Sequence, residues 1–283
     1  MAVKSSMLQN SIISAELVDF GHGRHNAYMN MAIDEVLLGL ADRTGRFFFR
    51  TYDFTKSSVI LANSDSPLNL KELDENVDVT RRISGGKPIY VDDNVLSYSI
   101  TGPMHGAASA FKNSTAINNM FGPLIMHAVA GIANNSDKLS MGKVYSIEFD
   151  GKPIVGNGQH LNASHSFLYH GVAAVGPWDA RSIDRRLWLR REDYDALYTL
   201  PNLHDIAGDG YTIQEYKSML SKDLRNAIGK AFSSKSEISE AEKDEVLKSA
   251  AGKVASIYAS KSWVYRDDPS MKRDSRFCLL WPD

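Results

Sequence analysis

The segment RRISGGKPIYVDDNVLSYS, residues 81–99, constrains the fold of this chain more than any other stretch. Residues 77–82 carry apolar and β-branched side chains, which predict a strand that runs into a turn. Ser84-Gly85-Gly86 predicts that turn, because glycine allows backbone conformations and close approaches that other residues resist. Residues 94–101 then predict a half-buried strand, since apolar and polar positions alternate: Val95, Ser97 and Ser99 against Leu96, Tyr98 and Ile100.

The charges beside this turn suit an anion. Backbone N–H groups of the two glycines can approach a phosphate or carboxylate, and an adjacent arginine can clamp it with two hydrogen bonds. Arg81 and Arg82 precede the turn, and Lys87 adds a third positive charge. A hairpin turn with solvated arginines remains an equally good interpretation of these residues alone.

The earliest helix is predicted over residues 27–40. Its apolar side chains recur at helical spacing and form one stripe: Met29, Ile33, Val36, Leu37 and Leu40. Asp34 and Glu35 fall on the other side of this predicted helix.

Later segments alternate between predicted strands and helices. We expect strands at residues 47–51, 58–62, 145–149, 152–155 and 169–175, and helices at about 113–132, 212–232 and 239–259. Asp150-Gly151 predicts a two-residue hairpin turn, and Thr212 with Glu215 predicts a capping box. Residues 233–240 are polar and predict a loop. Interleaved elements with hairpins favour an α+β fold over a doubly wound parallel sheet, and we expect a single domain over residues 1–283.

Composition excludes some classes of protein. The net charge of −2 gives no global basic field, so neither nucleic acid nor an anionic membrane is expected as a partner. The single cysteine, Cys278, cannot form an internal disulfide and fits a reducing cytoplasm, which is the expected localisation. No signal peptide and no stretch of about 20 apolar residues is present, so we expect no membrane span.

Motifs along the chain resemble those of lipoate–protein ligase A-like enzymes of the biotin/lipoate protein ligase superfamily. The family loop reads Arg-Arg-x-Ser-Gly-Gly-Gly-Ala-Val-aromatic-His-Asp and then Gly-Asn. It is matched in order by Arg81, Arg82, Ser84, Gly85, Gly86, Tyr90, Asp92 and Asn94. Residues 30–38, 58–63, 151–159, 169–171 and 262–269 resemble further family segments, so the resemblance covers nearly the whole chain.

The resemblance implies a cofactor transferase domain like that of class II aminoacyl-tRNA synthetases and biotin protein ligases, with a mixed, mostly antiparallel sheet flanked by helices. It implies ATP and Mg²⁺ as cofactors and lipoate as substrate. The matched loop would wrap the acyl group and the phosphate of lipoyl-AMP. Outside the loop it implies pocket roles for Gly156 and His170, with apolar residues such as Leu61 and Val172 beside the aliphatic tail; His170 alone could equally be a core residue.

Within the loop, Lys87 stands where the family has a third glycine and Val91 where it has histidine. Lys87, together with a change at Pro153, leaves the catalytic lysine open. The family lysine directly precedes Ile/Val-x-Gly, but Pro153 stands there and Lys152 comes one residue earlier. Because side chains alternate across a strand, Lys152 should point to the opposite face unless a bulge at Pro153 returns it. Lys87, in place of the third glycine, is the alternative ammonium group.

The family Asn-Asp that helps to hold nucleotide and metal corresponds to Tyr145-Ser146. Asp92 or Glu148 could substitute, and no dedicated metal site is predicted, because His160 and His165 lack partners at ligand spacing. A basic run is interpreted as a solvated face, with docking of an acidic acceptor as the alternative: Arg185, Arg186, Arg190 and Arg191.

Three functions therefore remain open. The first is an ATP-dependent lipoate–protein ligase that transfers lipoate to a lysine of an acceptor domain, from a 2-oxoacid dehydrogenase or a glycine cleavage H-type protein. The second is an ATP-independent octanoyl or lipoyl transferase, which would need a cysteine nucleophile. The third is a relative that binds lipoyl groups or nucleotides without turnover. Because the chain stops 14 residues after Pro269 without the accessory domain of bacterial-type ligases, we expect a separate small accessory subunit.

Overall fold

The computed structural model describes most of the chain, with short gaps. The described residues are 12–67, 70–71, 75–105, 108, 110–142, 145–163, 165–187, 199–208 and 210–265. Several residues discussed above lie outside the described ranges: Arg190, Arg191, Cys278 and residues 266–269 of the 262–269 motif.

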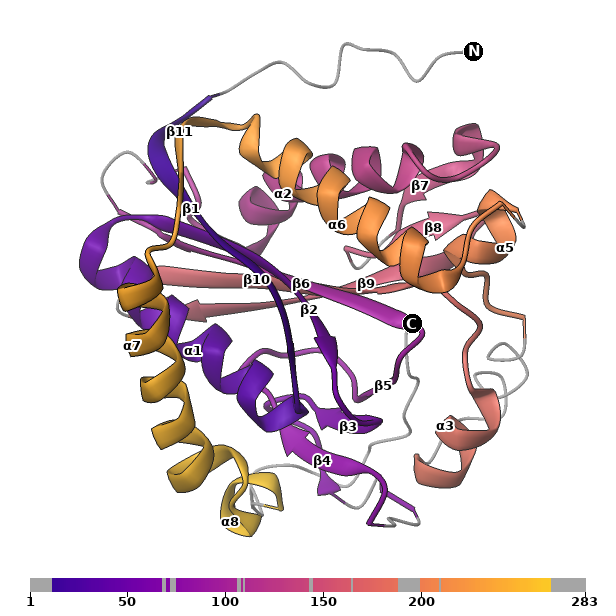
Figure 1. Cartoon of the computed structure of the whole chain (residues 1–283), viewed down its shortest axis with the longest axis horizontal. Helices are drawn as coiled ribbons and strands as arrows, with labels where there is room; N and C mark the ends of the chain where they lie inside the picture. The colour runs from indigo at the N-terminus through magenta and orange to yellow at the C-terminus, as the bar shows by residue number, and fades with distance from the viewer. Residues whose placement is uncertain are drawn as a thin grey trace.

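A large sheet forms the centre of the molecule (Figure 1). Its strand order is β11 (Phe232–Glu237), β1 (Ile13–His25), β2 (Phe47–Phe54), β6 (Val95–Pro103), β10 (Ser166–Ala174), β9 (Lys152–Asn162), β8 (Ile147–Phe149) and β7 (Leu139–Met141). Neighbours from β2 to β7 are antiparallel, whereas β1 is parallel to both β2 and β11. The predicted mixed, mostly antiparallel sheet flanked by helices is therefore confirmed.

Helices cover both faces of this sheet. In Figure 1, α2 (Ser114–Ala130) and α6 (Ile213–Gly229) lie above it, and α1 (Ala27–Thr44) and α7 (Glu240–Lys253) lie below it. Each face buries its own apolar cluster against its helices, so both sides of the central strands are in the protein interior. The shorter helical elements are η3 (Ser136–Lys138), α3 (Ala180–Arg186), α5 (Leu203–Ala207), η4 (Val254–Tyr258) and α8 (Lys261–Val264).

A second, three-stranded sheet lies on the α1 side of the large one (Figure 1). It places β3 (Ser58–Leu61) between the parallel strand β4 (Asp78–Arg81) and the antiparallel strand β5 (Ile89–Val91). The loop with the Ser-Gly-Gly motif connects β4 to β5. The small sheet therefore holds this loop against the large sheet.

Local signals act as the sequence predicted at several points. Thr212 and Glu215 form the reciprocal capping box at the start of α6. Asp150 and Gly151 both have positive φ, 52° and 74°, as a two-residue hairpin turn between β8 and β9 requires. Asn113 caps α2 by accepting a hydrogen bond of 2.9 Å from the backbone N–H of Ala116.

Three expectations were wrong. Strand β6 is buried at all nine positions rather than half-buried, because helices and the small sheet cover both of its faces. Residues 233–240 were expected to be a loop, but most of them form β11, a polar edge strand held by backbone pairing to β1. Asp34 is buried rather than on an exposed side of α1, since this helix also contacts β10 through the face that carries it.

Candidate functional site

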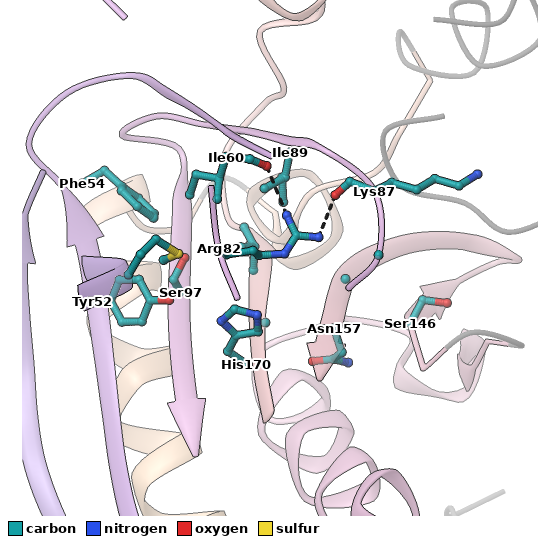
Figure 2. A pocket seen from close by; sticks show the side chains of 16 residues that line it. Tyr52, Phe54, Ile60, Arg82, Lys87, Ile89, Ser97, Ser146, Asn157 and His170 are labelled. Carbon is teal, nitrogen blue, oxygen red and sulfur yellow. Dashed lines mark hydrogen bonds between the residues drawn. The ribbon is translucent and has the colours of Figure 1, made fainter. Parts of the chain in front are cut away.

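A cavity of about 390 Å³ opens where α1, the small sheet and the large sheet meet. It is lined by residues of α1, β2, β3, β5, β6, β9 and β10, of the loop before β5 and of the turn before β8: Met31, Tyr52, Phe54, Ile60, Arg82, Gly86, Lys87, Ile89, Ser97, Ser146, Gly156, Asn157, Gly158, His170, Gly171 and Val172. Figure 2 shows Tyr52, Phe54 and Ser97 at one end, Arg82 and His170 in the middle, and Asn157 and Ser146 at the other end. The cavity is thus elongated, with one mainly apolar end and one polar end.

Sheet register explains which side chains reach this cavity. Strands β2, β6, β10 and β9 are neighbours, and opposed residues on one face form two lateral rows: Tyr52–Ser97–Val172–Gly156 and Arg50–Ser99–His170–Gly158. Glycine ends both rows on β9. A Cβ atom at Gly158 would lie 3.2 Å from Nε2 of His170, so the missing side chain keeps the floor of the cavity open.

Asp34 of α1 is the centre of a buried polar network over the second row. Its Oδ1 accepts from Nη2 of Arg50 at 2.6 Å and from the hydroxyl of Ser99 at 2.7 Å. Its Oδ2 accepts from Tyr52 at 3.3 Å and lies 3.3 Å from Nδ1 of His170. Burial alone would raise the pKa of Asp34, but the Arg50 guanidinium and His170 outweigh burial and lower it. Asp34 is therefore a buried carboxylate.

His170 is held from both sides. Nδ1 faces the Asp34 carboxylate, and Nε2 lies 2.6 Å from the hydroxyl of Ser84. The carboxylate can only accept, so Nδ1 donates to it and Nε2 accepts from Ser84. The order Ser–His–Asp resembles that of nucleophilic triads, but the side chain of Ser84 is fully buried and does not line the cavity. The array fixes the imidazole orientation rather than presenting a nucleophile.

Arg82 shapes the loop rather than extending into the cavity as a free cation. Its guanidinium donates to the hydroxyl of Ser84 at 3.0 Å and to the carbonyls of Ile60, Gly85 and Lys87 at 3.1, 2.8 and 2.8 Å. These four bonds leave one N–H of the five for a ligand. Burial lowers the pKa of Arg82 to about 10, so the guanidinium stays charged at neutral pH.

The loop wraps closely around this guanidinium. Gly86 has φ +101°, and a Cβ atom there would lie 3.0 Å from Nη2 of Arg82. The positive φ and the close approach to Arg82 both favour glycine at this position. The next residue, Lys87, lines the cavity through its backbone, while its side chain extends away from His170 (Figure 2).

Lys152 does not line the cavity. A bulge is present between β8 and β9, as Glu148 pairs with Pro153 but Ile147 pairs with Val155. The bulge leaves Ile154 and Val155 both in the core under α2 and α6. Lys152 is exposed and donates to the carbonyl of Thr199 at 3.2 Å. The bulge therefore does not return Lys152 to the cavity.

The other predicted residues fall into two groups. Arg82, Gly86, Lys87, Gly156 and His170 line the cavity, and Ser84 and Gly85 contact those residues by hydrogen bonds. Tyr90 packs in the small-sheet core, while Asp92 and Asn94 stabilise the turn before β6. Of the two residues expected beside an aliphatic tail, Val172 lines the cavity and Leu61 lies in the small-sheet core.

Arg81 holds two distant segments together. It is fully buried and donates to the carbonyls of Ala62 and Asp65 at 2.7 and 2.8 Å and to that of Val264 at 2.8 Å. It therefore anchors α8 to the loop after β3 and is not among the residues that line the cavity.

Sequence reasoning missed Asp34, Arg50 and Ser97. A signal for Asp34 and Arg50 was available in the sequence. An acidic residue in a mainly apolar helix and an arginine in an apolar strand both require partners if they are buried.

Among the described residues, no cluster of three or more His, Cys, Asp or Glu side chains could hold a metal ion. No carboxylate is found among the described lining residues either, so they do not fit a protein-held Mg²⁺. In the described part of the chain, no helix has the length and apolar character needed to cross a membrane.

The chain belongs to the lipoyl protein ligase A/B catalytic domain family, whose model matches residues 26–225. No curated protein sequence matches it significantly. Many solved structures share its fold, and three of them illustrate the likeness. A lipoate-protein ligase A bound with ATP has 18% sequence identity and a TM-score of 0.66, with 89% of this chain and 98% of that chain covered.

The second comes from a structural analysis of a bi-partite lipoate protein ligase and its E2 lipoyl domain from Thermoplasma acidophilum. It has 17% identity and a TM-score of 0.67, and the match covers 92% of this chain and 100% of that one. The third, P. falciparum LipL1 in complex with lipoate, has 13% identity and a TM-score of 0.65, with 90% and 75% covered. At these identities the likeness establishes the fold alone.

Proposed function

We propose that this chain is an ATP-dependent lipoate–protein ligase. The observation that carries the proposal is the elongated cavity, which has an apolar end for an aliphatic tail and a polar end beside the Gly-Gly loop. The carboxylate of lipoate would lie near Arg82 and His170, where it would attack the α-phosphorus of ATP to give lipoyl-AMP and release pyrophosphate. The acyl group then passes to a lysine amine of an acceptor domain, and AMP leaves.

The protein groups that line this cavity have defined roles in the proposal. Gly86 and Lys87 line the cavity, and backbone N–H groups of this loop would hold phosphate oxygens. His170, with its orientation fixed by Asp34 and Ser84, contacts the carboxyl group. Lys87 is the one lysine among the described lining residues, so it is the proposed source of the ammonium group that stabilises negative charge during transfer. Its side chain extends away from His170 in the structure, so this role requires the ammonium group to turn toward the bound acyl group.

Two solved relatives support the proposed ligands and partner. One was solved with ATP, and one comes from a bi-partite ligase system that includes an E2 lipoyl domain. A lipoyl domain is accordingly the proposed acceptor, and a separate accessory subunit is proposed for the adenylation step.

A matched pair of variants tests the proposal. Lys87→Ala should reduce AMP release and acceptor lipoylation by about 10²- to 10³-fold, the typical loss when one group that stabilises developing charge is removed. Lys152→Ala, the control, should retain activity because its ammonium group is exposed and binds Thr199. The assay supplies lipoate, ATP and a lipoyl domain, with and without a candidate accessory subunit, and follows AMP and acceptor mass.

Pro153 in the family lysine position favours a second candidate, a relative that binds lipoyl groups without turnover. Ligand-induced thermal stabilisation with neither AMP release nor transfer would support that candidate and reject the ligase. Transfer from an acyl-carrier thioester without ATP would instead support an acyltransferase.

A further inference from the structure

The polar end of the cavity lies at a gap in the large sheet. Strands β8 and β9 pair only as far as Ile147 and Val155, so the turn before β8 and the next residues of β9 do not pair with each other. Tyr145 in this turn has φ 62°, a left-handed conformation that residues other than glycine seldom adopt. Ser146 lines the cavity from the turn, and residues 156–158 line it from β9. Side chains rather than backbone pairing must therefore hold the two sides of the gap together.

The side chain of Asn157 spans this gap. Its Nδ2 atom donates to the backbone carbonyl of Tyr145, and its Oδ1 atom accepts from the hydroxyl of Tyr98 on β6. A carbonyl can only accept, so the amide has one possible orientation. Burial holds the pKa of Tyr98 well above its usual value, so its hydroxyl keeps the proton that it donates. Within the described part of the chain, these contacts leave one of the two N–H bonds of Nδ2 for a ligand.

Sheet register explains how Tyr98 reaches Asn157. Gly171 on β10 lies opposite Tyr98 on one side and opposite Asn157 on the other. A Cβ atom at Gly171 would overlap the hydroxyl of Tyr98 and Oδ1 of Asn157. The glycine therefore leaves the space in which a fully buried residue of the sheet centre and a half-buried residue of the cavity lining form their hydrogen bond.

We propose that Asn157 binds the nucleotide through its remaining N–H and that Tyr98 is the residue that positions this amide. A nucleotide presents phosphate and ribose oxygens, which accept hydrogen bonds and are repelled by carboxylates. Asn157 supplies a neutral donor at the polar end (Figure 2), and no carboxylate is found among the described lining residues. Without the hydroxyl of Tyr98, the amide is held at one atom only and loses its fixed orientation. This inference rests on the proposed function, because it assumes that the polar end takes ATP.

Tyr98→Phe removes the hydroxyl and keeps the ring, so it tests the positioning role without emptying the core. Binding of ATP and of lipoate to the full chain is measured by calorimetry for the wild type, Tyr98→Phe, Asn157→Ala and the double variant. We expect each single substitution to weaken ATP binding by about 3- to 10-fold, the range of one modest hydrogen bond, and to leave lipoate binding unchanged. The double variant should bind ATP no more weakly than Asn157→Ala, because Tyr98 acts through Asn157.

Tyr169→Phe is the matched control. Tyr169 is a fully buried residue of β10 whose hydroxyl donates to Oδ1 of Asn118 at 3.1 Å, so this variant also loses one tyrosine–asparagine hydrogen bond. Neither Tyr169 nor Asn118 lines the cavity. The control should lower the melting temperature about as much as Tyr98→Phe does, but it should leave ATP binding unchanged.

The outcomes distinguish this inference from the proposed function. If the wild type binds ATP and lipoate, and Tyr98→Phe or Asn157→Ala binds ATP as tightly, the inference is refuted while the ligase proposal stands. Equal losses of ATP affinity in Tyr98→Phe and Tyr169→Phe, or additive losses in the double variant, would also refute the positioning role. If the wild type binds no ATP, with or without a candidate accessory subunit, both the inference and the proposed ATP-dependent activity are rejected.

Discussion

The buried pair of Asp34 and Arg50 leads to a strong prediction about stability. Both residues are 1% exposed, and the carboxylate accepts two hydrogen bonds from the guanidinium, at 2.6 and 2.9 Å. Asp34→Asn keeps the shape of the side chain but removes its charge, so Arg50 becomes a buried cation without a counter-charge. The amide NH₂ also replaces an oxygen that accepts from Tyr52. Breaking a buried ion pair in this way costs about 3–5 kcal/mol.

Urea unfolding at pH 7, followed by intrinsic fluorescence, measures this cost. The control is Asp150→Asn, whose carboxylate pairs with Lys138 at 3.4 Å and is 71% exposed at its side chain, so its loss should be below about 1 kcal/mol. A loss at Asp34 no larger than the loss at Asp150 would refute the argument that burial makes this carboxylate important.

The pH dependence of the difference provides a second check. The pKa of Asp34 is lowered in the folded chain, so its charge stabilises the fold above the unfolded-state pKa of about 3.9. That stabilisation is lost as the pH falls through the lower folded-state pKa. The gap in unfolding free energy between wild type and Asp34→Asn should therefore be constant from pH 7 to about pH 5 and shrink below about pH 4.

Two further predictions concern the loops beside the cavity. Gly86→Ala should lower the unfolding free energy by about 1–2 kcal/mol and weaken lipoate binding, because φ is +101° and the new methyl group would approach Arg82. The control is Gly85→Ala, where a Cβ atom meets nothing within 4 Å, so its melting temperature should fall less. Equal losses of stability in the two variants would contradict the strain argument. Burial raises the pKa of Asp65 to about 6, so its ionisation opposes folding as the pH rises from about 4 to 6. Relative to Asp65→Asn, the wild type should lose about 1–3 kcal/mol of unfolding free energy between pH 4 and pH 7, and parallel stability curves for the two proteins would disprove the shift.

Local signals in the sequence predicted the framework of the site well. The Gly-Gly loop, the Asp150-Gly151 hairpin and the capping box at Thr212 depend on backbone geometry that a few adjacent residues determine. Positive charge beside glycine predicted a loop around an anion, whereas the structure shows the loop wrapped around the guanidinium of Arg82.

What the sequence did not reveal depends on partners far along the chain. Asp34 is 16 residues from Arg50 and 136 residues from His170, so its burial becomes visible only when α1 packs on the sheet. The bulge beside Pro153 shifts the register of β8 against β9 by one residue. The alternation of side chains along a strand does not predict such a shift, so the direction of Lys152 could not be predicted from the sequence. Strand β11 was missed because an edge strand with polar side chains is recognised by its backbone partner rather than by its pattern.

The pairing of β1 with β11 also has a consequence for how the protein is made. In the pairing, Ile13 lies opposite Phe232, so the two strands meet only after more than two hundred residues have been synthesised. Until then, the long strand β1 offers an unprotected hydrogen-bonding edge, although the last described residue that lines the cavity, Val172, precedes β11 by 60 residues. Such distant parallel pairing is slow, and an open edge invites association with other chains. The nascent protein can therefore complete its ligand cavity well before it is safe from aggregation, and early binding of ligand would stabilise the incomplete chain during that interval.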